Sequence, residues 1–390
     1  MAKKHYAYIN KDMLVWARGE TPFVSTSDVE AKQKSIKAEK LDLWERGEEL
    51  PSINEAKKLA ALYKVPFACF YLSAPPEKAP KNYVDRRTYG DTVYCETSYE
   101  LWKEIGRITQ NRKIMLDFTD GKTTNEKMPS FDENASVMDI AEFMREFLGL
   151  KPPYRTKSYY RGNAFGFFRS IIESKGIIVA QITDVSLNEM KGLSIYYDVY
   201  PIIAVNNKDY ERAKVFSLFH ELAHIIRRSS SLCMIDFDDR NDEEEKICDR
   251  IAAEILMPAT SFIAVVEKIR EEYHCWSTPC LQAVGDRFAV SSASVVRRLY
   301  ELNIISYSEY QTIYKKLSEE FEEKRLALEK TDKKNTIIKW DIRYLSKEGY
   351  LFPRIVVSAY HRGDLSYGEL CRALNLKSKY IDSIERAVML

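Results

Sequence analysis

The chain has 390 residues, of which 45% are hydrophobic and 30% charged, a composition typical of a folded globular protein with two or three domains. A net charge of +1 excludes a global field that attracts nucleic acid, so any basic surface must be local. Seven scattered cysteines without a Cys-x-x-Cys pair argue against a disulfide framework and an all-cysteine zinc site. The sequence has neither an apolar leader nor a membrane-length apolar run, and we expect a cytoplasmic protein with no membrane partner.

Short amphipathic helices are predicted before residue 176. Apolar side chains recur at helical spacing, and Gly47, Pro51 and Pro66 stand where such helices would end. The charged, proline-containing stretch from Glu77 to Thr92 predicts a linker, and the polar stretch from Gly121 to Glu133 predicts a loop. The segments with helical spacing are residues 13–17, 37–46, 56–63, 97–118, 137–148 and 165–175.

The middle of the chain adds a small sheet. Apolar, β-branched runs predict strands at 176–181, 192–197 and 200–205, and a helix with the buried residues Val215, Phe216, Phe219, Leu222, Ala223 and Ile226. A second helix is expected from about Asp242 to Leu256, and the remainder is expected to be mostly helical with a charged run at 319–334. We therefore expect an α+β, predominantly helical protein.

The strongest chemical signal is the sequence His-Glu-Leu-Ala-His at residues 220–224, in a chain that has only five histidines. Helix positions four apart share a face, so His220 and His224 can take adjacent corners of one zinc tetrahedron. Glu221 then lies beside the metal as the base for a bound water. The alternative is a buried helix with two hydrogen-bonded histidines and a surface glutamate.

A hydrolytic zinc site uses three protein ligands and keeps one position open for water. The residues after His224 contain no third histidine, so the third ligand is sought in the acidic run that opens the next helix. Glu245 is the preferred ligand because it precedes an apolar stretch in helical phase. Asp249, one turn further on, would accept the spare N–H of a ligand histidine.

Other side chains stay open as ligands. The carboxylates that could replace Glu245 are those of Glu243, Glu244 and Glu254. The thiols of Cys233 and Cys248 are soft enough to bind zinc, although a buried, inert cysteine is the commoner outcome. The other three histidines, His5, His274 and His361, are interpreted as ordinary surface or interface residues.

The expected chemistry is zinc-assisted hydrolysis. Zinc lowers the pKa of its water toward ~7 and polarises a scissile carbonyl. Glu221 takes the proton and later delivers it to the leaving amine. Two histidines and one glutamate form the ligand set of thermolysin-like enzymes. No residue is assigned to the oxyanion, because the many tyrosines of the chain do not single one out.

Three stretches resemble the ImmA/IrrE family of zinc metallopeptidases. They are Pro-Ile-Ile-Ala-Val-Asn at 201–206, Phe-Ser-Leu-Phe-His-Glu-Leu-Ala-His at 216–224, and Glu-Lys-Ile-Cys-Asp-Arg-Ile-Ala-Ala-Glu-Ile-Leu-Met-Pro at 245–258. The resemblance implies a zincin-like peptidase domain and supports Glu245 as the third ligand. The chain departs from the family pattern at Ser217, Ala223 and Cys248-Asp249, where the family has Thr, Gly and Ala-Asn. None of these departures removes a proposed ligand or base.

The N-terminal region resembles the Xre-type helix-turn-helix domain that is often fused before such peptidases. The resemblance is carried by residues 13–18, 40–47 and 59–72. It implies DNA contacts from Lys37, Lys40 and Arg46 in the presumptive recognition helix. Acidic residues in the same helix oppose phosphate, so a degenerate domain that docks a protein partner or dimerises is an equal alternative.

The resemblances divide the chain into four parts: residues 1–78 as the helix-turn-helix domain, 79–164 as a linker and helical region, 165–300 as the peptidase domain, and 301–390 as a C-terminal helical region. The leading functional hypothesis is a zinc endopeptidase whose partner is a protein substrate, a transcriptional repressor or similar regulator. One alternative is a DNA-binding regulator with a non-proteolytic zinc domain, and another is the protease of a toxin–antitoxin or phage-defence system. A homodimer is compatible with each hypothesis.

Overall fold

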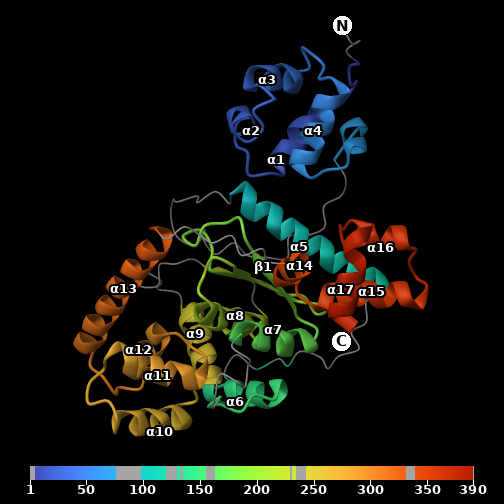
Figure 1. Cartoon of the computed structure of the whole chain (residues 1–390). Helices are drawn as coiled ribbons and strands as arrows, with labels where there is room; N and C mark the ends of the chain where they lie inside the picture. Colours follow the sequence, from blue (N-terminus) through green and yellow to red (C-terminus); the bar gives the residue numbers. More distant parts are fainter. Residues whose placement is uncertain are drawn as a thin grey trace. The chain divides into compact units, whose positions relative to one another are not determined.

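The computed structural model describes most of the chain: residues 5–75, 98–119, 129, 131, 135–154, 163–228, 231–233, 243–330 and 339–389. It confirms the predicted class, because helices predominate and a small mixed sheet packs against them (Figure 1). The chain divides into two compact units, and the border falls within helix α5 (Tyr99–Phe118), between Arg107 and Ile108. No helix of the described residues is long and apolar enough to cross a membrane.

The first unit is built from short helices around one apolar core. Leu14, Leu41, Trp44 and Phe70 are among the buried side chains that bring these helices together. The helices predicted within 13–17, 37–46 and 56–63 are confirmed, and α2 was not predicted as a separate helix. The elements are α1 (Lys11–Gly19), α2 (Thr26–Lys32), α3 (Ala38–Arg46), α4 (Ile53–Tyr63) and the 3-10 helix η1 (Phe67–Tyr71).

Local capping explains where several of these helices begin and end. Ser25 and Ser52 each accept a hydrogen bond from the backbone three residues on, and the acidic residue there bonds back to the serine, which forms a capping box. Gly47 ends α3 in the left-handed conformation with φ 76°, which a residue with a side chain rarely adopts.

The sheet of the second unit has the strand order β1-β3-β2-β4. β1 (Ile178–Ile182) and β3 (Ile202–Asn206) are parallel, whereas β2 (Gly192–Ile195) is antiparallel to β3 and to β4 (Ser231–Cys233). The three predicted strands are confirmed, and β4 was not predicted. All residues of the first three strands are buried, which is why they read as continuous apolar runs rather than as an alternating pattern.

Helices cover both faces of this sheet. α7 (Ala164–Ser174) and α8 (Glu211–Ile226) lie on one side and α14 (Trp340–Glu348) on the other (Figure 1). α8 packs against α9 (Glu243–Leu256), and their buried residues share the largest core of the protein. On the predicted face of α8, Phe216 is only half-buried and the unpredicted Leu218 is fully buried, because helices and sheet enclose α8 from residue 218 onward.

The remaining described elements are helical, which confirms that the C-terminal region is mostly helical. Their bounds are α6 (Val137–Leu148), α10 (Ala259–Arg270), α11 (Thr278–Phe288), α12 (Ser292–Glu301), α13 (Tyr307–Lys330), α15 (Leu351–Arg362), α16 (Tyr367–Ala373), η3 (Ser378–Tyr380) and α17 (Ile381–Met389). The predicted linker at 77–92 and most of the predicted loop at 121–133 lie outside the described residues. The domain borders at 78, 164 and 300 stay predictions.

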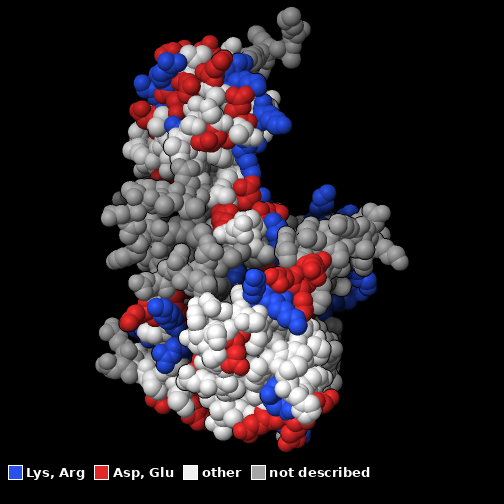
Figure 2. Space-filling model, turned by 90° about the vertical axis from the view of Figure 1, so that its left-hand side faces the viewer, with Lys and Arg blue, Asp and Glu red and all other residues white. Residues whose placement is uncertain are grey.

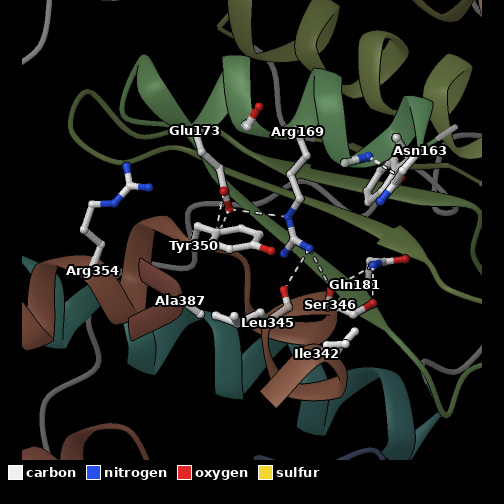
Figure 3. Close-up of a pocket in the computed structure, with 13 residues that line it drawn as sticks. Asn163, Arg169, Glu173, Gln181, Ile342, Leu345, Ser346, Tyr350, Arg354 and Ala387 are labelled. Atoms are coloured by element: carbon white, nitrogen blue, oxygen red, sulfur yellow. Dashed lines mark hydrogen bonds and ion pairs between the residues drawn. The ribbon is translucent and has the colours of Figure 1, made fainter. Parts of the chain in front are cut away.

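A buried arginine joins the C-terminal helices to the sheet. Arg169 on α7 donates hydrogen bonds to the carbonyl oxygens of Leu345 and Ser346 on α14 (Figure 3). It also donates to the carbonyl oxygen of Val179 on β1. Glu173, one turn along α7, forms an ion pair with Arg169 and accepts the backbone N–H of Tyr350. A cavity of about 630 Å³ lies beside these residues. The polar side chains that line the cavity largely bond to one another, which indicates that they join α7, β1 and α14 structurally.

Candidate metal centre

The helix α8 presents both motif histidines to α9, as their spacing predicts. His220 and His224 are 5% and 0% exposed, and their ring centroids lie 4.9 Å apart. Their Nε2 atoms approach to 3.2 Å, so both imidazoles aim at one point. This arrangement follows from the helical repeat, which stacks residues four apart on one face.

Glu245 on α9 brings a carboxylate to the same point. Its Oε2 lies 3.1 Å from Nε2 of His220, and its Oε1 lies 3.4 Å from Nε2 of His224. One ligand atom of each of the three residues lies within 4.8 Å of the others, and all three residues are buried. The structure therefore brings together the two histidines and the preferred third ligand.

Each histidine is held at its other ring nitrogen by a residue of α9. Nδ1 of His220 lies 2.8 Å from Oδ1 of Asp249, and Nδ1 of His224 lies 3.4 Å from Sγ of Cys248. A carboxylate can only accept, so Asp249 places the proton of a neutral His220 on Nδ1. Its Nε2 then presents a lone pair to the Glu245 oxygen, and two lone pairs at 3.1 Å repel. A divalent cation between the three donors removes this repulsion, so the residues present fit a zinc ion.

The two acidic residues of the centre remain ionised in this environment. Burial raises the pKa of Glu245, but hydrogen bonds and positive charge from the protonated forms of His220 and His224 outweigh it and leave that pKa well below its usual range. Burial also raises the pKa of Asp249, and the hydrogen bond from His220 together with the charge of Arg297 lowers it overall. Both carboxylates therefore supply the negative charge that a bound cation needs.

The carboxylates that were kept as substitutes for Glu245 are placed differently. Glu243 is exposed, Glu244 makes a bidentate ion pair with Arg227 at 2.7 Å, and Glu254 pairs with Arg298. None of these three glutamates lies in the group formed by His220, His224 and Glu245. The geometry therefore favours Glu245 over the alternatives.

A second group of ligand types, His224, Glu244 and Cys248, lies close enough together to be considered. It would use Nδ1 of His224 and the thiolate of Cys248. Burial raises the pKa of the Cys248 thiol, although His224 acts in the opposite direction, and Arg227 already occupies the Glu244 carboxylate. Cys248 therefore fits the role of a hydrogen-bond partner for His224 better than that of a ligand. The side chain of Cys233, the other candidate thiol, lies outside the described residues.

The predicted base, Glu221, is fully buried beneath the first residue of β2. A Cβ atom at Gly192 would overlap Oε1 of Glu221 and would lie 2.9 Å from its Cγ and Cδ. Only glycine therefore leaves the carboxylate of Glu221 in its place. The role of Gly192 could not be predicted from the sequence, because it depends on how closely the strand approaches α8.

Replacing Gly192 with Ala is expected to lower peptide-bond cleavage by about 100-fold, because a displacement near 1 Å of a reacting group has an effect of that size. Zinc content should not change, because the three atoms nearest to the added methyl group all belong to Glu221. Cleavage of a mixed peptide library, followed by mass spectrometry, and metal analysis of the same preparation measure both effects. Gly368→Ala is the matched control, since a Cβ atom there meets nothing within 4 Å. Full activity in Gly192→Ala would contradict this role.

The three predicted DNA contacts lie on or beside α3 and are exposed. Lys37 forms an ion pair with Glu30 at 2.7 Å, and Arg46 lies 3.4 Å from Glu48. On the face shown in Figure 2, acidic and basic side chains are interspersed over the first unit, at the top of the view. Lys37, Lys40 and Arg46 therefore stay predictions, and so does the helix-turn-helix domain.

The three histidines interpreted as surface residues, His5, His274 and His361, are exposed. His361 pairs with Glu385 at 2.6 Å, far from the other histidines in the sequence. The predicted centre on α8 and α9 thus contains the two remaining histidines of the chain.

Comparison with known families singles out the same part of the chain. A family model described as the IrrE N-terminal-like domain, Peptidase_M78, matches residues 178–300. The match begins at the first residue of β1 and ends within α12, so it contains the sheet and the predicted metal ligands. It suggests a metallopeptidase domain, in agreement with the buried group of His220, His224 and Glu245. No curated protein matches the chain at a significant level.

Proposed function

We propose that the chain is a zinc-dependent endopeptidase that hydrolyses a peptide bond of a protein substrate. The observation that carries this proposal is the convergence of His220, His224 and Glu245 on one buried point, inside a region that matches a peptidase family. Asp249 supports it, because a carboxylate on the far nitrogen of a ligand histidine is the usual partner in catalytic zinc sites.

Each residue of the centre has its own role in the proposed hydrolysis. His220, His224 and Glu245 would hold the zinc ion, which supplies a water of lowered pKa and polarises the substrate carbonyl. Asp249 holds His220 in the tautomer that leaves Nε2 free for the metal, and Cys248 contacts Nδ1 of His224. Glu221 accepts the proton of the attacking water and passes it to the nitrogen of the leaving amine. Gly192 leaves the room that the Glu221 carboxylate occupies.

The proposed substrate is a transcriptional repressor or a similar regulatory protein. The sequence resemblance to the ImmA/IrrE peptidases supports this class, since members of that family cleave repressors or promote their removal. The same chemistry would serve the protease of a toxin–antitoxin or phage-defence system, which differs only in the protein that is cut. A growth arrest on expression that His220→Ala abolishes would favour that alternative.

Metal removal tests the proposed function directly. The purified chain is expected to contain about one zinc ion, and a chelator should abolish cleavage of a mixed peptide library. Added zinc should restore both the metal content and the cleavage. Zinc absent from the purified chain and not taken up on addition would overturn the metal centre. Zinc bound without any cleavage, in the library or of a co-expressed repressor, would overturn the peptidase and favour a non-proteolytic regulator.

A further inference from the structure

An arginine on α12 reaches the metal centre through Asp249. Nη2 of Arg297 lies 2.9 Å from Oδ2 of Asp249, whose other oxygen, Oδ1, lies 2.8 Å from Nδ1 of His220. Arg297, Asp249 and His220 thus form one continuous chain of contacts from α12 through α9 to α8. Nothing in the sequence motifs points to Arg297, which stands 48 residues after Asp249.

The three residues of this contact path differ in how deeply they are buried. Asp249 and His220 are almost fully buried, whereas the side chain of Arg297 is 34% exposed. A second contact, from Nε of Arg297 to Oε1 of Glu301 at 3.2 Å, holds the guanidinium along α12. With His220 on Oδ1 and Arg297 on Oδ2, both oxygens of the Asp249 carboxylate have a partner, which restricts how the carboxylate can turn.

Charge gives a second reason why Asp249 needs this partner. Asp249 and Glu245 lie one turn apart on α9, and both are buried. Two anions at this spacing repel, and burial strengthens the repulsion. Arg297 supplies a positive charge on the side of Asp249 that faces away from His220, so Asp249 can remain a pure acceptor for the Nδ1 proton.

We propose that Arg297 is a positioning residue of the metal centre, which fixes Asp249 and through it holds His220 with Nε2 directed at the zinc ion. This inference rests on the proposed function. Residues beyond the immediate ligands tune a metal site by orienting the ligands, and their loss costs about 10- to 100-fold in metal affinity. Arg297 acts through one intervening residue, so the lower end of that range is expected.

The neighbouring residue Arg298 offers a matched comparison. It also runs from α12 to an acidic residue of α9, Glu254, and it donates a further hydrogen bond to the carbonyl oxygen of Met257. Its contacts involve no partner of His220 or His224. Arg298 therefore joins the same two helices with the same chemistry, but it touches no partner of the ligands and is linked to Arg297 only through their shared contact with Glu301.

Zinc affinity of the full chain, measured by competition with a chromogenic chelator, tests the inference. Arg297→Met is expected to bind zinc about tenfold more weakly than the unaltered protein, and Arg297→Lys should fall between them because it keeps the charge and loses the planar geometry. Arg298→Met should lower the thermal unfolding temperature and leave the zinc affinity of the folded protein unchanged. The absorption bands of bound cobalt(II) should shift in Arg297→Met and not in Arg298→Met.

A double-mutant cycle shows whether Arg297 acts through Asp249. Once Asp249→Asn has removed the carboxylate, Arg297→Met should have little further effect on zinc affinity. Equal zinc affinity and an unchanged cobalt spectrum in Arg297→Met would overturn the inference, as would full additivity in the cycle. If Arg297→Met does not fold, Arg297→Lys gives the same decision. An unaltered protein that binds no zinc would instead overturn the proposed function.

Discussion

Replacing His220 with Ala is expected to weaken zinc binding by about a thousandfold or more. Structural zinc sites bind with about 10–16 kcal/mol in total, so the loss of one of three protein ligands removes several kcal/mol. The variant also leaves Glu245 and Asp249 buried beside each other without the imidazole that both contact. Zinc content after dialysis and the dissociation constant from chelator competition measure the loss.

Matched variants separate the loss of a ligand from a general loss of stability. His274→Ala makes the same chemical change at an exposed histidine and should bind zinc like the unaltered chain. In the acidic run of α9, Glu245→Gln should lose most of the zinc affinity, whereas Glu243→Gln should keep it. If Glu243→Gln and Glu245→Gln bind zinc equally well, the third ligand is wrongly assigned.

The sequence allowed the ligands to be predicted because their signal is local. His220 and His224 stand four apart on one helix, and the helical repeat alone places both imidazoles on one face. Glu245 needed more information, because helical phase left other carboxylates open and the family resemblance favoured one of them. Only the packing of α8 on α9 shows that Glu243 points to solvent and that Glu244 is held by Arg227.

Residues whose role depends on a distant partner could not be predicted. Gly192 matters because β2 passes directly over Glu221, and Arg297 matters because α12 lies beside α9. Both contacts join segments that are far apart in the sequence. A glycine or an arginine does not by its residue type alone indicate such a role. The short strand β4 was missed for a similar reason, since three residues carry no detectable alternation and their pairing with β2 defines the strand.

The overall class was predictable for a different reason. The first three strands are buried on both faces, so they appear in the sequence as apolar runs bounded by glycine or asparagine. The attachment of α14 to β1 could not be predicted in this way. It depends on the buried guanidinium of Arg169, which donates hydrogen bonds to backbone carbonyl oxygens of β1 and α14. Every residue has a backbone carbonyl group, so the sequence does not show which ones accept these bonds.

Replacing Glu221 with Gln is expected to lower peptide-bond cleavage by about a thousandfold while zinc binding is retained. The substitution keeps the shape of a side chain that is fully buried and closely covered by Gly192, so the fold and the ligands should be undisturbed. It removes the group that accepts the proton of the attacking water, and general-base catalysis contributes about 100- to 10,000-fold. Cleavage of the mixed peptide library and zinc content, measured on one preparation, test both statements.

A matched control variant and the alternative outcomes allow the Glu221→Gln experiment to distinguish between the proposed functions. Glu211→Gln makes the same change at the start of the same helix, where the side chain accepts the backbone N–H of Ala164, and it should cleave normally. If Glu221→Gln cleaves like the unaltered chain, Glu221 is not the base. If Glu221→Gln loses cleavage yet still regulates transcription in cells, the zinc domain acts without proteolysis. If the unaltered chain regulates transcription in cells and Glu221→Gln loses both activities, that regulation depends on hydrolysis at α8.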